Sequence, residues 1–448
     1  MKKRKKDIIG FIILIVNSFI FFICSNFYIL DKGYNIKIPI IISIIIILLI
    51  NIIPSLLSKK IYDNNLKKIR NGYRLLIVFL LNIVFDIIFY SVSYFSYQIN
   101  SKILLINLII LIIILGILFW NGIIRSYIYS KQLGIRYRIT GILLGMIPIL
   151  HLVMLVKIIK ICFDEVEFEN DKIITNIERK DKKICKTKYP ILFVHGIFFR
   201  DSNFFNYWGR IPDELIKNGA TIYYGNHSSS LSVKDSGKEI ADRIKEIIEK
   251  ANCKKVNIIA HSKGGLDSRY AISNLGMDKY VASLTMINTP NHGCQFAEYL
   301  LNKAPEGFKK KVASAYNHTL KKLGDKAPDF IAGVTDLTFD KVEKLNKKMP
   351  SSKKVYYQEF GSILKRARGG RFPLNLTNNF VGLFDGRNDG LVGEESFQLD
   401  ENYKLIEAPF DRGISHGDVI DLNRENIKGY DVREFYVQLV SDLKKKGY

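Results

Sequence analysis

A serine lies at a predicted sharp turn between a strand and a helix in the middle of the chain. The apolar run 256–260 predicts the strand, and residues 264–275 predict a helix that follows directly. Small residues, Ala260 and Gly264, stand two positions to either side of Ser262. Larger side chains there would collide across a turn whose central residue is held in a strained conformation, although glycine is more usual at position 260. The pattern predicts that Ser262 is a nucleophile for acyl transfer, and an ordinary turn serine is the alternative.

A serine nucleophile needs a base to take its proton and a carboxylate to orient that base. Folds that carry such a turn place these groups in the order serine, acid, histidine. Asp389 follows the apolar run 380–384, which we expect to be a strand, and His416 is the only histidine after it. We therefore predict Asp389 as the acid, with Asp385 as the alternative, and His416 as the base. We expect His195, at the end of an early strand, to brace a loop by hydrogen bonds.

The intermediate of such a reaction carries a negatively charged oxygen, and backbone N–H groups must face it. One donor belongs to the residue after the nucleophile, Lys263. The other comes from the loop after an early strand, and residues 189–194 followed by His-Gly fit that strand. We expect the backbone amides of Ile197 and Lys263 to form this oxyanion hole.

Apolar runs with strand character alternate with helical patterns along residues 188–448. The strands are expected at 189–194, 221–224, 256–260, 281–287 and 354–360, and the helices at 208–218, 235–250 and 264–275. This alternation predicts the α/β class, with a mainly parallel sheet covered by helices on both faces. Together with the serine turn it predicts an α/β-hydrolase fold over residues 188–448.

Residues 294–350 are less regular than the rest of this domain and are rich in lysine. A lid over the site and an ordinary solvated helical insertion are both compatible with this composition. Three apolar residues of the segment are expected to face the core: Ala297, Leu300 and Leu301. Three others are expected to line the mouth of the site: Phe308, Val312 and Ala315.

Apolar runs separated by basic loops dominate the first third of the chain. Four runs reach the ~20 residues that cross a bilayer, and a fifth is shorter. They lie at about 8–30, 38–57, 75–94, 103–124 and 139–156. We expect residues 1–163 to form an all-α transmembrane domain and the charged residues 164–187 to form a linker.

Two ionisable residues lie inside these runs, Asp86 in the third and His151 in the fifth. An ionisable group within a membrane is a functional candidate by default. The alternative that we favour for Asp86 is a packing role, with a polar partner from another helix.

The positive charge of the chain is concentrated in the same third. The formal net charge is +23, and residues 1–160 contain 20 Lys and Arg against 4 Asp and Glu. Basic residues gather before the first run, between the second and third, and after the fourth, so the positive-inside rule places these loops in the cytoplasm. We expect the run 139–156 to cross, which makes the hydrolase domain extracytoplasmic; without that crossing the domain is cytoplasmic. The charge fits anionic membrane lipid, and no nucleic-acid-binding module is recognisable.

The cysteines show neither a CxxC motif nor the spacing of metal ligands. They are Cys24, Cys162, Cys185, Cys253 and Cys294. A disulfide between two of the last three stays open, but no disulfide framework is expected. No cofactor is expected either.

Five motifs within residues 188–448 resemble the bacterial triacylglycerol lipases. They are Val-His-Gly at 194–196, Asn-Ile-Ile-Ala-His-Ser-Lys-Gly-Gly-Leu-Asp-Ser-Arg-Tyr at 257–270, Asn-Thr-Pro-Asn-His-Gly at 288–293, Asn-Asp-Gly-Leu-Val at 388–392 and Ser-His-Gly-Asp at 415–418. The resemblance implies that Ser262 is the nucleophile, Asp389 the acid and His416 the base, in agreement with the order along the chain.

The chain departs from this family in two respects. The family often binds a structural calcium through the aspartate after the catalytic histidine, here Asp418, and through another aspartate before the catalytic acid. Residues 360–384 contain no acid, and calcium needs several oxygen ligands, so we do not expect the metal. The family is also usually soluble and secreted, whereas this chain has a predicted membrane domain, which leaves the natural substrate open.

The sequence thus predicts a membrane-anchored serine hydrolase that cleaves carboxylic esters of lipids through an acyl-enzyme. A phospholipase and a lipid acyltransferase are the nearest alternatives. An inert membrane transport or assembly protein is the alternative of another class. We also expect the Lys263 side chain to bias the mouth of the site toward anionic lipid.

Overall fold

The chain folds into two compact units, Met1–Ile177 and Glu178–Tyr448, in a computed structural model. Each unit has hydrophobic clusters of its own. The structure describes residues 2–30, 37–54, 59–96, 101–145, 147, 149–197, 206–228, 230–303, 305–322, 328–371, 374–408 and 411–448.

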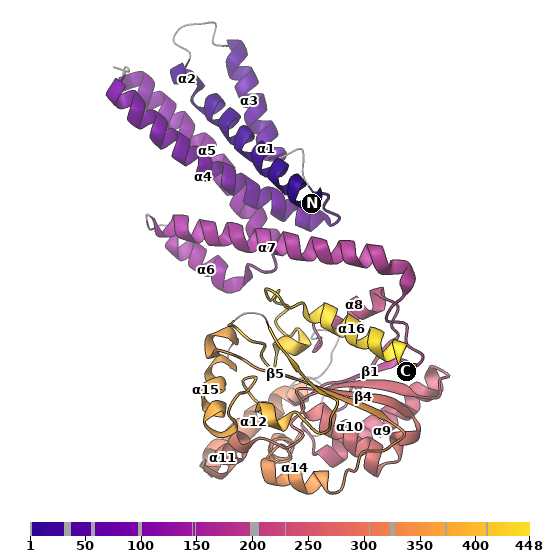
Figure 1. The fold of residues 1–448 in the computed structure, drawn as a ribbon. Coiled ribbons are helices and arrows are strands. Elements are labelled where there is room, and N and C mark those ends of the chain that lie inside the picture. The colour runs from indigo at the N-terminus through magenta and orange to yellow at the C-terminus, as the bar shows by residue number, and fades with distance from the viewer. Residues whose placement is uncertain are drawn as a thin grey trace. The chain divides into compact units, whose positions relative to one another are not determined.

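The first unit is built from helices. In chain order they are α1 (Lys2–Ser25), α2 (Phe27–Leu30), α3 (Lys37–Ile52), α4 (Asn64–Ser96), α5 (Ser101–Tyr129), α6 (Gly134–Leu144) and α7 (Leu150–Arg179), whose last residues enter the second unit. Helices α1, α3, α4 and α5 lie side by side as a bundle (Figure 1). The stretches long and apolar enough to cross a membrane are Ile8–Ser25, Asn64–Ser93 and Ser101–Tyr129, and the apolar stretch Pro39–Ile52 of α3 is shorter. Many large apolar side chains of these helices are exposed, which is compatible with a surface that contacts lipid.

The predicted fifth span, 139–156, is not one continuous helix. Its first part ends α6 and its last part begins α7, and the run contains a proline, which lacks the N–H that a continuous helix requires. Helix α6 lies against α7, since a Cβ added to Gly141 would come 3.3 Å from Ile158 Cδ1. The predicted linker 164–187 is also largely helical, because α7 continues to Arg179.

A buried polar cluster joins three segments of the first unit. Asn26 Nδ2 donates a hydrogen bond of 2.7 Å to Asp86 Oδ1. Asn26 Oδ1 accepts from the Tyr90 hydroxyl and from Asn107 Nδ2 at 3.0 Å each. Asp86 therefore has a polar partner from another segment, as the packing interpretation predicts.

A six-stranded sheet forms the centre of the second unit (Figure 1). Its strands are β1 (Ile191–Val194), β2 (Ile222–Tyr224), β3 (Val256–His261), β4 (Val281–Ile287), β5 (Tyr356–Ser362) and β6 (Tyr403–Ile406). Their order is β2-β1-β3-β4-β5-β6, and every neighbouring pair is parallel. The predicted α/β class is confirmed. Strand β6 is outside the prediction because its 4 residues are mostly only partly buried and include a lysine.

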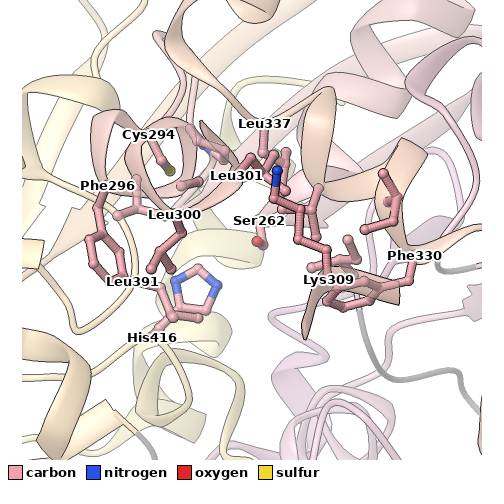
Figure 2. Close-up of a pocket in the computed structure, with 16 residues that line it drawn as sticks. Ser262, Cys294, Phe296, Leu300, Leu301, Lys309, Phe330, Leu337, Leu391 and His416 are labelled. Atoms are coloured by element: carbon pink, nitrogen blue, oxygen red, sulfur yellow. The ribbon is translucent and has the colours of Figure 1, made fainter. Parts of the chain in front are cut away.

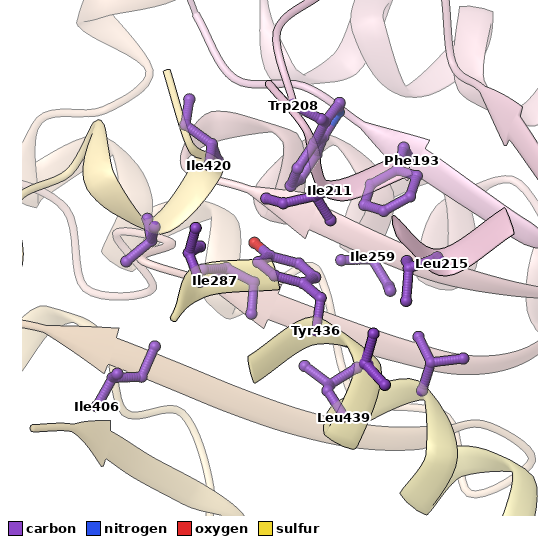
Figure 3. Packing of buried hydrophobic residues seen from close by; sticks show 14 of the residues in the cluster. Phe193, Trp208, Ile211, Leu215, Ile259, Ile287, Ile406, Ile420, Tyr436 and Leu439 are labelled. Atoms are coloured by element: carbon purple, nitrogen blue, oxygen red, sulfur yellow. The ribbon is translucent and has the colours of Figure 1, made fainter. Parts of the chain in front are cut away.

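Helices cover both faces of the sheet. They are α8 (Ile211–Lys217), α9 (Val233–Lys250), α10 (Lys263–Asn274) and α16 (Val432–Lys445). Successive residues of a strand point to opposite faces. Phe193 and Ile259 pack with α8 and α16 on one face (Figure 3), whereas Leu192 and Ile258 pack with α9 and α10 on the other. Strands β1 and β4 read as mostly apolar runs because both of their faces are buried.

The run 380–384 lies in helix α15 (Leu374–Asp385) and not in the strand that the sequence predicts. A short apolar run does not distinguish a strand from a helix. The buried residues of α15 are Leu374 and Val381, which are two helical turns apart and therefore lie on one face.

The described part of 294–350 is mostly helical. It contains α11 (Gln295–Lys303), α12 (Glu306–Lys322), α13 (Phe330–Thr335) and α14 (Phe339–Asn346). The expected irregular insertion is thus a set of short helices, and it follows β4 at the edge of the sheet where the strands end.

Candidate active site

Ser262 lies at the C-terminal end of β3, where the chain turns sharply into α10. Its backbone has a φ of 53° and a ψ of −133°, a conformation that residues other than glycine rarely adopt. A Cβ added to Gly264 would lie 2.4 Å from the carbonyl oxygen of His195, so this position requires glycine. Ala260 packs in the hydrophobic cluster of α9 and α10, where its methyl group is accommodated. The predicted strand–turn–helix is present.

Asp389 and His416 are held together by two hydrogen bonds. His416 Nδ1 donates to Asp389 Oδ2 over 2.6 Å, and the His416 backbone N–H donates to the Asp389 carbonyl over 2.9 Å. Asp389 Oδ1 accepts from the backbone N–H groups of Leu391 and Val392 at 2.9 Å each. The carboxylate is fully buried and its orientation is fixed. Because the proton of Nδ1 is used in this pair, Nε2 of a neutral His416 is left as a proton acceptor.

Asn288 is a supporting residue to which the sequence analysis assigned no role. Its Nδ2 donates to Asp389 Oδ2 over 2.5 Å and to Ser362 Oγ over 2.7 Å. Asn288 directly follows β4 and Ser362 ends β5, so the carboxyl ends of two parallel strands meet at this carboxylate. A polar residue immediately after a buried strand was the signal that could have identified it.

The alternative acid, Asp385, faces another element. Its carboxylate oxygens accept from the backbone N–H groups of Gln295 and Phe296 at 3.0 Å each, which are the first residues of α11. This arrangement caps the helix and favours negative charge at its N-terminus. Burial raises the pKa of Asp385. The structure therefore places Asp389, and not Asp385, against His416.

Ser262 and His416 line the same pocket, whose volume is about 280 Å³ (Figure 2). Most of its wall is apolar and comes from α11, α13 and the loop after Asp389; examples are Phe296, Leu300, Leu301, Ile331, Val334 and Leu391. Cys294 also lines the pocket, and all five cysteines are free thiols. Burial raises the pKa of Cys294 well above its usual range, so this thiol stays protonated and is a poor nucleophile.

The two residues expected to form the oxyanion hole both lie near Ser262. Ile197 follows β1 and lines the same pocket as Ser262. Lys263 is the first residue of α10, where backbone N–H groups have no partner within the helix and the helix dipole favours negative charge. That the amides of Ile197 and Lys263 form the oxyanion hole stays a prediction.

Tyr207 links the loop after β1 to the end of β3, a role that the sequence did not indicate. Its hydroxyl accepts from the Gly196 backbone N–H over 3.0 Å and pairs with His261 Nδ1 over 2.6 Å. Burial lowers the pKa of His261 well below its usual range, and nearby His416 adds to the shift, so His261 is a neutral acceptor. Through Tyr207, His261, which precedes Ser262, is thus linked to Gly196, which precedes Ile197. No local pattern around Tyr207 indicates this contact, which joins residues 54 positions apart.

The Lys263 side chain does not face the mouth of the site, contrary to the prediction. It is fully buried, and its Nζ donates to both carboxylate oxygens of Asp267 at 2.7 and 2.9 Å and to Ser236 Oγ at 3.0 Å. Burial raises the pKa of Asp267 to about 7, and the Lys263 ammonium opposes this shift. The spacing of four residues in a helix was the signal for this ion pair.

Asp418, the residue considered for calcium, has a cationic side chain as its partner. Arg412 Nη1 lies 2.8 Å from Asp418 Oδ2, and its Nη2 lies 3.2 Å from Glu425 Oε2. The Ser415 backbone N–H also donates to Asp418 Oδ2 over 2.9 Å. Among the residues that the structure describes, no group of three or more His, Cys, Asp or Glu side chains is placed to hold a metal. The donor set around Asp418 does not fit calcium, because a guanidinium faces its carboxylate.

The side chains of His195, His292 and His318 are not among those that line the pocket of Ser262 and His416. His195 is fully buried, with Nδ1 2.9 Å from the Gly196 carbonyl and Nε2 3.2 Å from the His227 carbonyl, which agrees with the predicted bracing role. His292 contacts α14, and His318 is exposed on α12.

The segment 294–350 contributes to the pocket. Ala297, Leu300 and Leu301, which we expected to face the core, line the pocket instead. The side chains expected at the mouth of the site, those of Phe308, Val312 and Ala315, lie outside the described residues.

Parts of the chain are similar to known proteins. Residues 192–300 match the family described as "Putative serine esterase (DUF676)". The triacylglycerol lipase of Pseudarthrobacter phenanthrenivorans is 31% identical over 178 residues, which is 37% of this chain and 55% of the relative. The triacylglycerol lipase of Pseudomonas fragi is 26% identical over 294 residues, 58% of this chain and 98% of the relative. This chain thus spans about half of the first relative and nearly all of the second.

A solved structure with a similar chain is Staphylococcus hyicus lipase. It covers 58% of this chain and 98% of its own length, at 21% identity and a TM-score of 0.45. The family match covers β3, β4 and the turn that carries Ser262. This region is similar to serine esterases, and a longer region of the chain is similar to the bacterial triacylglycerol lipases.

Proposed function

We propose that this chain is a membrane-anchored serine hydrolase that cleaves carboxylic esters of lipids. Ser262 is the nucleophile, His416 the base and Asp389 the acid. The observation that carries the proposal is the hydrogen bond of 2.6 Å between His416 Nδ1 and Asp389 Oδ2, formed by a histidine that lines the same pocket as the strained Ser262.

In the first step Ser262 Oγ attacks the ester carbonyl carbon and His416 Nε2 takes its proton. Asp389 stabilises the imidazolium that forms and keeps its orientation. The backbone amides of Ile197 and Lys263 stabilise the negative oxygen, a contribution worth about 3 kcal/mol for one donor in comparable sites. His416 then gives the proton to the departing alcohol, and the acyl group remains on Ser262.

In the second step water attacks the acyl-enzyme, with His416 as base, and releases the carboxylic acid. A lipid alcohol in place of water would give acyl transfer with the same residues. The pair of Asp389 and His416 beside Ser262 argues against an inert membrane transport or assembly protein, because such a protein has no need of a buried, oriented histidine.

The apolar pocket and the triacylglycerol lipase relatives support a lipid ester as substrate. The apolar helices of the first unit support anchoring in the bilayer. An anchored enzyme meets its substrate by diffusion within the membrane, and the acyl chain passes from one apolar environment to another.

The side of the membrane depends on the run 139–156, which we expected to cross. Its division between α6 and α7 removes the main support for a crossing, since α6 has 11 residues and a span needs about 20. The basic segments before α1, between α3 and α4 and after α5 place these parts of the chain in the cytoplasm, which requires α3 to cross although its apolar stretch is shorter than those of α1, α4 and α5. The hydrolase unit, which follows the last basic segment, is then also in the cytoplasm. We therefore propose a cytoplasmic site, opposite to the expectation from sequence.

No cofactor takes part in the proposed reaction. The pairing of Arg412 with Asp418 supports this, because the guanidinium supplies the positive charge beside the loop that carries His416.

Replacing Ser262 with alanine is expected to lower the turnover of short-chain p-nitrophenyl esters by about 10⁴-fold or more, because the acyl-enzyme can no longer form. The measurement is initial-rate kinetics on the purified chain, with and without an added alcohol to separate hydrolysis from acyl transfer. Ser273→Ala, in the same helix, is the matched control and is expected to retain activity. Turnover retained by the Ser262 variant would exclude the mechanism.

Replacing Tyr207 with phenylalanine removes the hydroxyl that joins Gly196 to His261. We expect kcat to fall about 10-fold with little change in KM, because the hydroxyl positions groups that act mainly on the oxyanion. Tyr280→Phe is the control, since Tyr280 lies in a short turn before β4. An equal effect of both variants would show that Tyr207 has no positioning role.

Replacing Arg412 with alanine leaves the Asp418 carboxylate, 2% exposed, without its cation. We expect a loss of about 1–3 kcal/mol in the free energy of unfolding, because the buried carboxylate loses a hydrogen-bonding partner. The control is Arg366→Ala, because the side chains of Arg366 and Asp411 are 49% and 77% exposed and such surface pairs contribute about 0–1 kcal/mol. Chelation by EDTA is expected to leave activity of the native chain unchanged. Inhibition by EDTA that calcium reverses would contradict this assignment.

A cytoplasmic hydrolase unit is expected to resist protease added to intact cells and to be degraded after permeabilisation. Immunoblotting of a C-terminal tag measures the protection. Degradation in intact cells would instead show that the run 139–156 crosses the membrane.

A further inference from the structure

Among the described residues that line the pocket beside Ser262, one is a lysine. That side chain is Lys309, which belongs to α12, and Figure 2 shows it over the pocket. The other lining residues that are neither Ser262 nor His416 are apolar or, in Cys294, a neutral thiol. A pocket built for a purely apolar ligand has no use for an ammonium group, because removing that charge from water is costly.

The ammonium group of Lys309 is held only weakly by its ion-pair partner. Its recorded partner is Glu306, one helical turn earlier, at 2.8 Å. The Glu306 side chain is 74% exposed, whereas that of Lys309 is 19% exposed. Exposed pairs of this kind contribute little, so a ligand that brings its own negative charge can replace the carboxylate.

The helix that carries Lys309 is strongly basic. Residues 306–322 contain five lysines and one glutamate. The charge attracts anionic headgroups, which in membranes are mainly phosphate-bearing lipids. An ammonium group binds phosphate as a compact point charge.

We propose that the site takes an anionic glycerophospholipid, a proposal that rests on the proposed function. The acyl chain lies among the apolar side chains of α11 and α13, the ester carbonyl lies at Ser262, and the phosphate lies at Lys309. Hydrolysis breaks the bond between the acyl carbon and the glycerol oxygen. The glycerol oxygen gains a proton, the acyl carbon gains hydroxyl from water, and the products are a fatty acid and a lysophospholipid.

This assignment moves the recognition of anionic lipid from Lys263 to Lys309. Lys263 is adjacent to the nucleophile in sequence, but its ammonium is enclosed by Asp267 and Ser236. Lys309 is distant in sequence, yet it shares a pocket with Ser262. A neutral triacylglycerol would leave this ammonium facing an apolar ligand.

The test compares kcat/KM of the full-length chain on phosphatidylglycerol, phosphatidylcholine and triacylglycerol with the same acyl chains, in mixed micelles of one neutral detergent. The native chain is expected to favour phosphatidylglycerol over phosphatidylcholine by about 10-fold. In Lys309→Met, which keeps the length and loses the charge, the ratio of phosphatidylglycerol to triacylglycerol cleavage is expected to fall about 10-fold, mainly through KM. Lys310→Met, at the exposed neighbouring position of α12, is expected to keep the native ratio.

Three outcomes would overturn the proposal: equal rates on the two phospholipids in the native chain, equal losses on phosphatidylglycerol and triacylglycerol in Lys309→Met, or the same loss of ratio in Lys310→Met. The last outcome would show attraction by the basic helix as a whole. Turnover of p-nitrophenyl esters by the native chain and its loss in Ser262→Ala report separately on the proposed function. A failure of the headgroup assignment is thereby distinguished from a failure of the mechanism.

Discussion

The candidate site depends on one constraint, the sharp turn that projects Ser262 from the end of β3. Its backbone conformation, with a φ of 53°, is unfavourable for a residue with a side chain, and the surroundings must hold it. The Ser262 backbone N–H donates to the Ile287 carbonyl at the end of β4 over 2.9 Å. Gly264 allows the first turn of α10 to approach the His195 carbonyl, where no Cβ fits. The strain at the nucleophile is thus supported by the strands on either side.

The parallel sheet brings the remaining groups to the same edge. All its strands run in one direction, so the loops after β1, β3, β4 and β5 meet where the strands end. Asn288 directly follows β4 and also donates to Ser362 at the end of β5, and its amide and two backbone N–H groups donate to the Asp389 carboxylate. Fixed dipoles of this kind stabilise charge without reorganising during a reaction. The orientation of His416 is therefore a consequence of strand order.

Charges near the site are divided between ion pairs with a buried carboxylate and one lysine whose carboxylate partner is exposed. Lys263 and Asp267 form a fully buried pair beneath the turn, and Arg412 with Asp418 forms a second pair beside His416. In both cases removing one partner leaves the other charge in a poorly solvated place. Lys309 differs, because its partner is exposed and its ammonium lines the pocket. Lys263 and Arg412 stabilise the local structure around the site, whereas Lys309 can contact a ligand.

The sequence by itself determined the fold class, the candidate nucleophile Ser262, and His416 as the only histidine after Asp389. These features are local or depend on order: a buried run, small residues around Ser262, and a motif ending in His416. Residues far apart in sequence required the tertiary structure. It decided that Asp389 and not Asp385 contacts His416, that Tyr207 joins the loop after β1 to the end of β3, and that the Lys263 side chain is buried. It also divided the run 139–156 between two helices. Hydropathy records how apolar a segment is, but the direction of a side chain and the partner of a charge are set by packing against segments that no local pattern identifies.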